Sequence, residues 1–209
     1  RRLAEMYDKY GDFRAAFDDK FPNCPDWQKI SYHGTIAPEM DLTGKEHLIS
    51  EELGKSDVAV VVLGRGSGET SDRHIENDFN LTAEETAMLN KIGAECRKQG
   101  KKMIVVMNVC GVMETDSWKW NADGIVMAWF PGQECGYAVA DVISGKVCPS
   151  GRLPMTFPIK YSDIPSSKNY PYVGQTEGRN FDYTNYEEDI WVGYRYFSTA
   201  HRGVSYPFG

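Results

Sequence analysis

The chain has 209 residues, of which 41% are hydrophobic and 25% charged, a composition typical of a globular domain with a packed core. Its formal net charge of −7 argues against nucleic acid and anionic membranes as partners, because both repel an acidic surface. No apolar run approaches the roughly 20 residues that a membrane-spanning helix needs. No signal peptide is recognisable, which leaves the compartment open, with a cytoplasmic location favoured over secretion.

The cysteines give no sign of a metal or redox site. Their number is odd, their spacings are wide and no C-x-x-C pair occurs, so we interpret them as small structural side chains. The five are Cys24, Cys96, Cys110, Cys135 and Cys148. The sequence therefore predicts no metal and no organic cofactor.

The first part of the chain predicts helices joined by a loop. Apolar residues recur at helical spacing over residues 1–21, and residues 22–38 contain the Pro, Asn and Gly that favour a loop. A second helix is expected over residues 45–53, ended by Gly54. We assign residues 1–55 to this N-terminal region.

Strands and helices then alternate. The run "DVAVVVLG", from residue 57, is continuous and β-branched, which is typical of a parallel strand buried on both faces. Thr82 and Glu85 form a capping-box pattern at the start of the following helix, and Gly100 is its expected end. Strand–helix–strand order with short connections predicts an α/β fold, a mainly parallel sheet flanked by helices, over residues 56–160. The later expected elements are a helix at 81–102, strands at 103–109 and 124–130, and a helix at 132–145.

The alternation stops after Cys148, and residues 161–209 are predicted to form an irregular tail. "PSGRLPMTFP", residues 149–158, is expected to be an extended edge segment because it is rich in Pro and Gly. Residues 161–189 form a long polar stretch, and such loops are usually functional or disordered. "IWVGYRYF", residues 190–197, is interpreted as a last strand or an extended arm.

A candidate site follows the first buried strand. Ligands of open α/β sheets bind beyond the carboxyl ends of the strands, and the charged segment "GRGSGETSDRHIENDF" begins there. Its glycines do not complete the dinucleotide fingerprint, because Ser71 stands at the last glycine position. Glu69 lies behind Gly66 and Gly68, which permit unusual backbone angles. On spacing alone, Glu69 is either a solvated loop carboxylate or a functional one.

Three blocks resemble glycoside hydrolase family 3. They are "SDVAVVVLGRGSGETSDR", "PGQECGYAVADVISGKVCPSGRLPMTFP" and "YEEDIWVGYRYF…YPFG", in this order, over roughly residues 56–209. The resemblance is to the α/β sandwich that follows the catalytic barrel of β-glucosidases. It implies a retaining β-glucosidase, or a relative such as a β-xylosidase, that acts on β-linked oligosaccharides or β-glucosides.

The resemblance also implies roles for the charged loop. Many members carry the general acid/base glutamate in a loop of the form S-G-E-x-x-D-R, so it implies that Glu69 is the acid/base. Ser67 is then a candidate substrate-binding residue, and Arg65, Asp72 and Arg73 are candidates for supporting the loop.

The chain lacks an S-D-W motif for the aspartate nucleophile and lacks eight β/α units. We therefore expect it to be part of a larger enzyme, whose barrel comes from the same protein or a partner chain and whose tail leads toward a fibronectin-type domain. A homo-oligomer is compatible with the aromatic tail.

Two alternatives to a catalytic role remain open. The first is a non-catalytic sandwich domain with a structural or carbohydrate-contacting role. The second is a flavodoxin-like nucleotide binder, which shares the sheet pattern but has a phosphate loop that this chain lacks.

Overall fold

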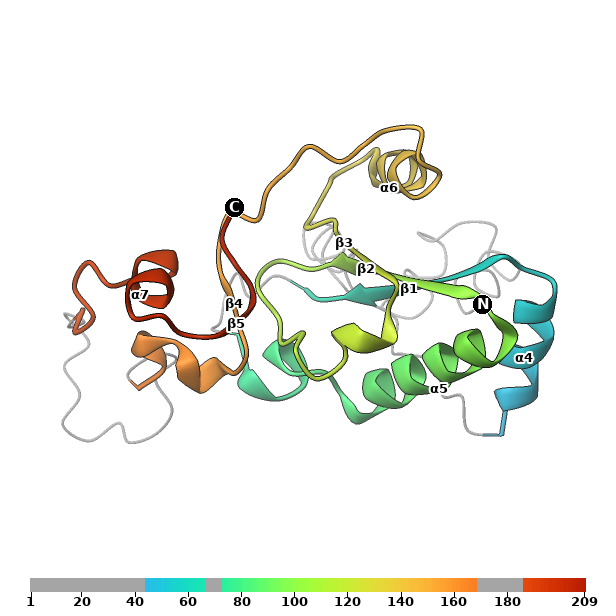
Figure 1. Cartoon of the computed structure of the whole chain (residues 1–209), viewed down its shortest axis with the longest axis horizontal. Coiled ribbons are helices and arrows are strands. Elements are labelled where there is room, and N and C mark those ends of the chain that lie inside the picture. The colour runs from blue at the N-terminus through green and yellow to red at the C-terminus, as the bar shows by residue number, and fades with distance from the viewer. Residues whose placement is uncertain (1–43, 67–72, 169–185) are drawn as a thin grey trace, which may run out of the picture. The chain divides into compact units, whose positions relative to one another are not determined.

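The computed structural model describes residues 44–66, 73–168 and 186–209, drawn in colour in Figure 1. All of them belong to one compact unit, Met40–Gly209. The expected helix at residues 1–21 and the loop at 22–38 lie outside the described residues.

Three parallel strands form the sheet in the order β1-β2-β3: β1 (Val58–Gly64), β2 (Lys102–Asn108) and β3 (Gly124–Met127). Val61 pairs with Val105, which pairs in turn with Ile125. The predicted parallel sheet is confirmed. The third strand was expected to reach residue 130, but it ends at Met127 because Trp129 has a φ of 55°, outside the extended region.

The two helices before and after β1 are where the sequence predicts them. They are α4 (Glu46–Gly54) and α5 (Ala83–Gln99), which packs along β1 and β2 and contacts α4 (Figure 1). Both halves of the capping box between Thr82 and Glu85 are present at the N-terminus of α5. Gly100 ends the helix in the left-handed conformation, with a φ of 67°, which explains why glycine stands there.

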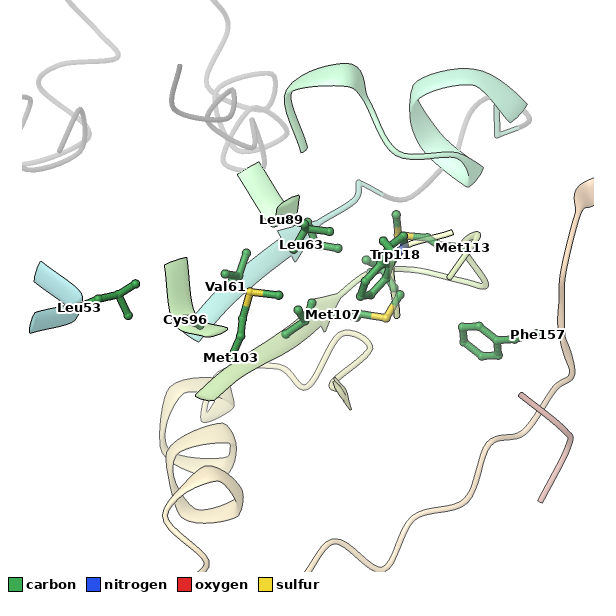
Figure 2. Packing of buried hydrophobic residues seen from close by; sticks show 12 residues of the cluster. Leu53, Val61, Leu63, Leu89, Cys96, Met103, Met107, Met113, Trp118 and Phe157 are labelled. Carbon is green, nitrogen blue, oxygen red and sulfur yellow. The ribbon is translucent and has the colours of Figure 1, made fainter. Parts of the chain in front are cut away.

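The core lies between this sheet and the helices α4 and α5. Figure 2 shows Leu89 of α5 in one cluster with Leu63 of β1 and Met103 of β2, and all three side chains are fully buried. The other face of β1 differs from its predicted burial, because Val60 and Val62 are 46% and 54% exposed. The expectation of burial on both faces is therefore wrong for β1. Within the described residues, β1 pairs only with β2 and is an edge strand.

An ion pair aligns β2 with the start of β3. The carboxylate of Asp123 accepts hydrogen bonds from Lys102 Nζ at 2.7 Å and from the backbone N–H of Met103 at 2.9 Å. The pKa of Asp123 lies below its ordinary value, chiefly because of the bond from Lys102. Asp123 thus connects the first residues of β2 to the start of β3.

After β3 come α6 (Cys135–Ile143), the two-residue strand β4 (Phe157–Pro158), α7 (Tyr194–Thr199) and β5 (Val204–Tyr206). β4 and β5 pair antiparallel, which gives the expected extended segment its partner. The interpretation of residues 190–197 as a strand or arm is wrong, because residues 194–199 are helical and bury Phe197. Residues 169–185 of the expected polar stretch lie outside the described residues. Short 3₁₀ turns occur at Lys119–Asn121, Tyr161–Asp163 and Pro165–Lys168.

Two further features concern membranes and cysteines. Within the described ranges, no helix has the length and apolar character to cross a membrane. The four cysteines in these ranges are all free, and Cys96 is buried in the core, where burial raises the pKa of its thiol.

A buried ion pair joins the end of β1 to the start of α5. Arg65 Nη2 donates to Glu85 Oε2 at 2.6 Å, and Arg65 Nη1 donates to the other carboxylate oxygen. Glu85 is 1% exposed and Arg65 is 8% exposed, so the pair is shielded from water. Glu85 thus accepts bonds from Arg65 and from the N-cap N–H of Thr82 with the same carboxylate.

Truncation of the core should destabilise this unit. Leu89→Ala removes a fully buried side chain and should lower the free energy of unfolding by about 2–5 kcal/mol, because a cavity remains. Leu48→Ala is the matched control, since Leu48 is 42% exposed and should cost less than about 1 kcal/mol. Urea unfolding of the two variants measures the difference, and equal losses would contradict the assigned core.

Neutralising Glu85 should break the buried ion pair while leaving the cap. Gln is also accepted at this helix position, so Glu85→Gln retains a capping side chain but removes the buried counter-charge of Arg65, leaving only the more distant Asp78 carboxylate at 3.9 Å. We expect a loss of about 3 kcal/mol in urea unfolding. Glu84→Gln, an exposed neighbour in the same helical turn, should cost below about 1 kcal/mol. Similar values for both variants would mean that the charge on Glu85 contributes little.

Candidate functional site

The candidate site is built at the carboxyl edge of the sheet, where β1 and β2 end side by side. Arg65 is the first residue after β1, and its backbone N–H donates to the carbonyl of Asn108, the last residue of β2, at 3.1 Å. Since its side chain is also held by Glu85, Arg65 fixes the point at which the chain leaves the sheet. The motif Ser67-Gly68-Glu69, which the family resemblance predicts to carry the acid/base, follows two residues later in the chain.

Arg73 fixes the point at which the chain returns from that loop. Its Nη2 and Nε atoms donate to Asp78 Oδ1 at 2.6 Å and 3.0 Å, and its Nη1 donates to the carbonyl of Val112 at 2.9 Å. Val112 lies in the segment that follows β2, so Arg73 ties the returning chain to the same edge of the sheet. Both side chains of the ion pair are partly buried, which limits its screening by water.

Asp78 connects the two arginines. Its carboxylate holds Arg73, and its backbone carbonyl accepts a hydrogen bond from Arg65 Nε at 2.9 Å. Asp78 lies in the irregular helical turn Ile75–Phe79, in which Asn77 has a φ of 63°. A single residue therefore anchors the chain on both sides of residues 67–72.

The guanidinium of Arg73 lies directly against Gly111. A Cβ atom at position 111 would be 2.8 Å from Arg73 Nη1, closer than side chains approach in folded proteins. Any residue other than glycine there would displace the end of the arginine side chain. The path of Arg73 thus explains why glycine stands at position 111, shortly after β2.

A cavity of about 270 Å³ opens beside this anchor. Phe79 and Tyr161 form part of its wall, with their ring centroids 5.4 Å apart in an edge-to-face arrangement. Arg73 and His74 add polar groups to a mostly apolar lining. The described residues that line it are Arg73, His74, Ile75, Phe79, Val112, Tyr161 and Ile164.

The structure locates only part of the predicted site. Glu69, Ser67 and Asp72 lie outside the described residues. Arg65 and Arg73, predicted to support the loop, both lie at the edge of the sheet with paired side chains. Among the described residues, the ion-pair partner of Arg73 is Asp78.

Three structural roles at this site were missed by sequence reasoning. Asp78 and Gly111 were not singled out, and Glu85 was assigned only to the helix cap. The five-residue separation of Arg73 and Asp78 gives no regular helical or strand pairing, so no periodic signal indicated it. Among the described residues, no group of three His, Cys, Asp or Glu side chains is arranged to hold a metal ion.

Comparisons with known proteins agree on one family. The model of the glycosyl hydrolase family 3 C-terminal domain matches residues 15–194. Beta-glucosidase A of Butyrivibrio fibrisolvens is 31% identical over the whole chain, which spans 28% of that protein. An exo-alpha-(1->6)-L-arabinopyranosidase of Bifidobacterium longum is 34% identical over 76% of the chain, corresponding to 20% of that protein.

A solved structure extends the likeness to the fold. Beta-glucosidase 3B from Thermotoga neapolitana in complex with glucose superimposes with a TM-score of 0.75 and 37% identity, over 99% of this chain and 29% of that one. The chain therefore spans less than a third of the length of these relatives. Its parallel sheet, its matched segments and its likeness to glycoside hydrolases together show that the chain belongs to glycosyl hydrolase family 3, as the C-terminal α/β domain.

Proposed function

We propose that this domain supplies the general acid/base, Glu69, to the active site of a retaining β-glucosidase. The aspartate nucleophile would come from a (β/α)8 barrel elsewhere in the same protein or in a partner chain. The substrate would be a β-linked oligosaccharide or a β-glucoside, with Ser67 contacting the sugar and Asp72 supporting the loop. The observation that carries the proposal is the double anchor at Arg65 and Arg73, on either side of the loop that holds Glu69.

The charges around the anchors favour a catalytic rather than a structural glutamate. Arg65 is paired with Glu85, and Arg73 is paired with Asp78. Neither arginine requires Glu69 as a counter-ion, so the simplest structural role for this carboxylate is already filled by other residues. A loop fixed at both ends can also hold a side chain in one position, which proton transfer requires.

The same pairing suits the chemistry of a general acid. A retaining glycosidase needs two carboxyl groups about 5–5.5 Å apart, one to attack the anomeric carbon and one to protonate the leaving oxygen. The acid must stay protonated near neutral pH, which an unpaired arginine nearby would oppose. Because Asp78 and Glu85 neutralise the two arginines, this opposing effect is reduced.

A second candidate substrate class comes from one relative. The Bifidobacterium longum protein is named an arabinopyranosidase and matches as well as several β-glucosidases do. The alternative function is therefore hydrolysis of an L-arabinopyranoside by the same two-carboxylate mechanism. Rates on p-nitrophenyl β-D-glucoside, β-D-xyloside and α-L-arabinopyranoside, measured as kcat/KM with the full-length protein, would rank these candidates.

Removal of Glu69 should abolish general acid–base help. In the full-length enzyme, Glu69→Ala should lower kcat/KM on cellobiose by about 100- to 10,000-fold. The loss should be smaller on 2,4-dinitrophenyl β-glucoside, because this leaving group needs no protonation. Azide should restore turnover on the activated substrate and yield β-glucosyl azide, identified by NMR.

The matched control is Glu76→Ala, which removes an exposed carboxylate near the loop. This variant should keep wild-type rates on both substrates. Near-normal rates for Glu69→Ala would instead support a non-catalytic domain with a structural or carbohydrate-contacting role.

Asp78 should act on the reaction through Arg73. Asp78→Asn leaves the Arg73 charge uncompensated and loosens one anchor, so we expect kcat to fall about 10- to 100-fold. The alkaline limb of the pH–rate profile should move to lower pH, because an unpaired positive charge favours loss of the proton from the general acid.

Asp141→Asn is the control for Asp78→Asn, since it breaks an exposed ion pair with Lys146 on a different part of the domain. Its pH–rate profile should match that of the wild type. A fall in kcat for Asp78→Asn without any shift of the alkaline limb would refute the electrostatic part of the argument.

A further inference from the structure

The segment that follows β2 touches both of the anchoring arginines. Its first contact is the hydrogen bond from the backbone N–H of Arg65 to the carbonyl of Asn108, the last residue of β2. Its second contact is the hydrogen bond from Arg73 Nη1 to the carbonyl of Val112. The short stretch between these two carbonyls therefore links the two arginines, and it contains Gly111.

Core packing holds this segment in place. Val109 and Met113, on either side of Gly111, are both fully buried in the hydrophobic core. The backbone N–H of Glu114 also donates to the carbonyl of Phe79 at 2.8 Å. Because buried side chains in a close-packed interior shift only at a cost, the segment resists movement away from an atom placed against it. A clash at position 111 is therefore relieved by movement of the arginine that lies against it.

The backbone conformation of Gly111 does not explain why glycine stands there. Gly100 and Gly132 have φ values of 67° and 79°, in the left-handed region that favours glycine, whereas the φ of Gly111 is not positive. The constraint at position 111 is the contact with Arg73, whose Nη1 would lie 2.8 Å from an added Cβ atom.

The arginine atom that would meet this Cβ is also the atom that bonds to Val112. Ordinary contact with a Cβ atom begins at 3.4 Å, so Nη1 would have to move by about 0.6 Å, the difference between 3.4 Å and 2.8 Å. Nη1 is the donor to the carbonyl of Val112, at 2.9 Å. The bonds to Asp78 come from Nε and Nη2 instead. A side chain at position 111 would thus displace Arg73 from Val112 while Asp78 still compensates its charge.

On the basis of the proposed function, we propose that Gly111 is a positioning residue for the reaction and acts through Arg73 on the position of Glu69. Gly111 allows Arg73 to bond to Val112 and to Asp78 at the same time, which fixes the chain on the far side of Glu69 against the edge of the sheet. Proton transfer depends steeply on position, because a misplacement of about 1 Å can lower a rate about 100-fold. The smaller displacement at Arg73 should therefore have a measurable effect on the rate.

A double-mutant cycle of Gly111→Ala and Arg73→Lys in the full-length protein tests this role. With Arg73 present, Gly111→Ala should lower kcat on cellobiose about 10-fold. In the Arg73→Lys background it should cost less than about 2-fold, because the lysine side chain lacks the Nη1 atom that clashes while its ammonium retains the charge opposite Asp78. A glycine required by any other neighbour would cost the same in both backgrounds.

Two further measurements separate positioning from electrostatics. The loss caused by Gly111→Ala should be smaller on 2,4-dinitrophenyl β-glucoside, because this leaving group needs no protonation. The alkaline limb of the pH–rate profile should stay at its wild-type position, since Asp78 still compensates the charge of Arg73. This result contrasts with the shift expected for Asp78→Asn, and a shifted limb in Gly111→Ala would overturn the positioning role.

Gly136→Ala is the matched control, because it adds the same methyl group to a glycine of α6. The added Cβ would meet no atom of the described residues within 4 Å, so kcat should not change. Urea unfolding of the Gly111 and Arg73 variants tests the contact without reference to catalysis. Gly111→Ala should be destabilising when Arg73 is present and close to neutral in the Arg73→Lys background.

The outcomes separate a failure of this role from a failure of the proposed function. An equal loss of kcat in both Arg73 backgrounds, or on both substrates, would overturn the role of Gly111 whatever Glu69→Ala shows. Coupling in urea unfolding without coupling in kcat would also overturn it, because the contact would then be structural alone. Near-normal rates for Glu69→Ala would instead overturn the proposed function, and with it the step on which Gly111 is inferred to act.

Discussion

The buried ion pair between Arg65 and Glu85 is the interaction on which the candidate site depends. It lies where β1 ends and α5 begins, and the same carboxylate completes the cap of that helix. A charge pair in this position contributes little to stability compared with apolar packing, but loss of either partner is costly. Its effect is to fix the direction in which the chain leaves the sheet.

The edge of the sheet is organised around this fixed point. Asp78 accepts a hydrogen bond from Arg65 through its backbone and holds Arg73 through its side chain, and Gly111 leaves room for the Arg73 guanidinium. These contacts are two polar interactions and one close approach to a glycine, and none of them is apolar packing. Such an arrangement favours precision of position over gain in stability, which is what the proposed acid/base role of the loop requires.

The C-terminal segment is integrated with the core by different means. Phe157 of β4 is buried in the core cluster, and Ser205 of β5 is bonded to Thr115 near the end of the sheet. The short helix α7 precedes β5 in this segment and buries Phe197.

The sequence by itself determined the elements that local chemistry specifies. The β-branched run before Gly64, the capping box of Thr82 and Glu85 and the left-handed glycine at 100 all act within a few residues, and each was found where expected. The family motifs also indicated Glu69, whose position in space is not among the described residues. Only the tertiary structure revealed the pairing of Arg65 with Glu85, the contact of Arg73 with Gly111 and the exposed outer face of β1. The two contacts join residues about 20 and about 40 positions apart, and all three features depend on which strands and segments become neighbours, which no local pattern encodes.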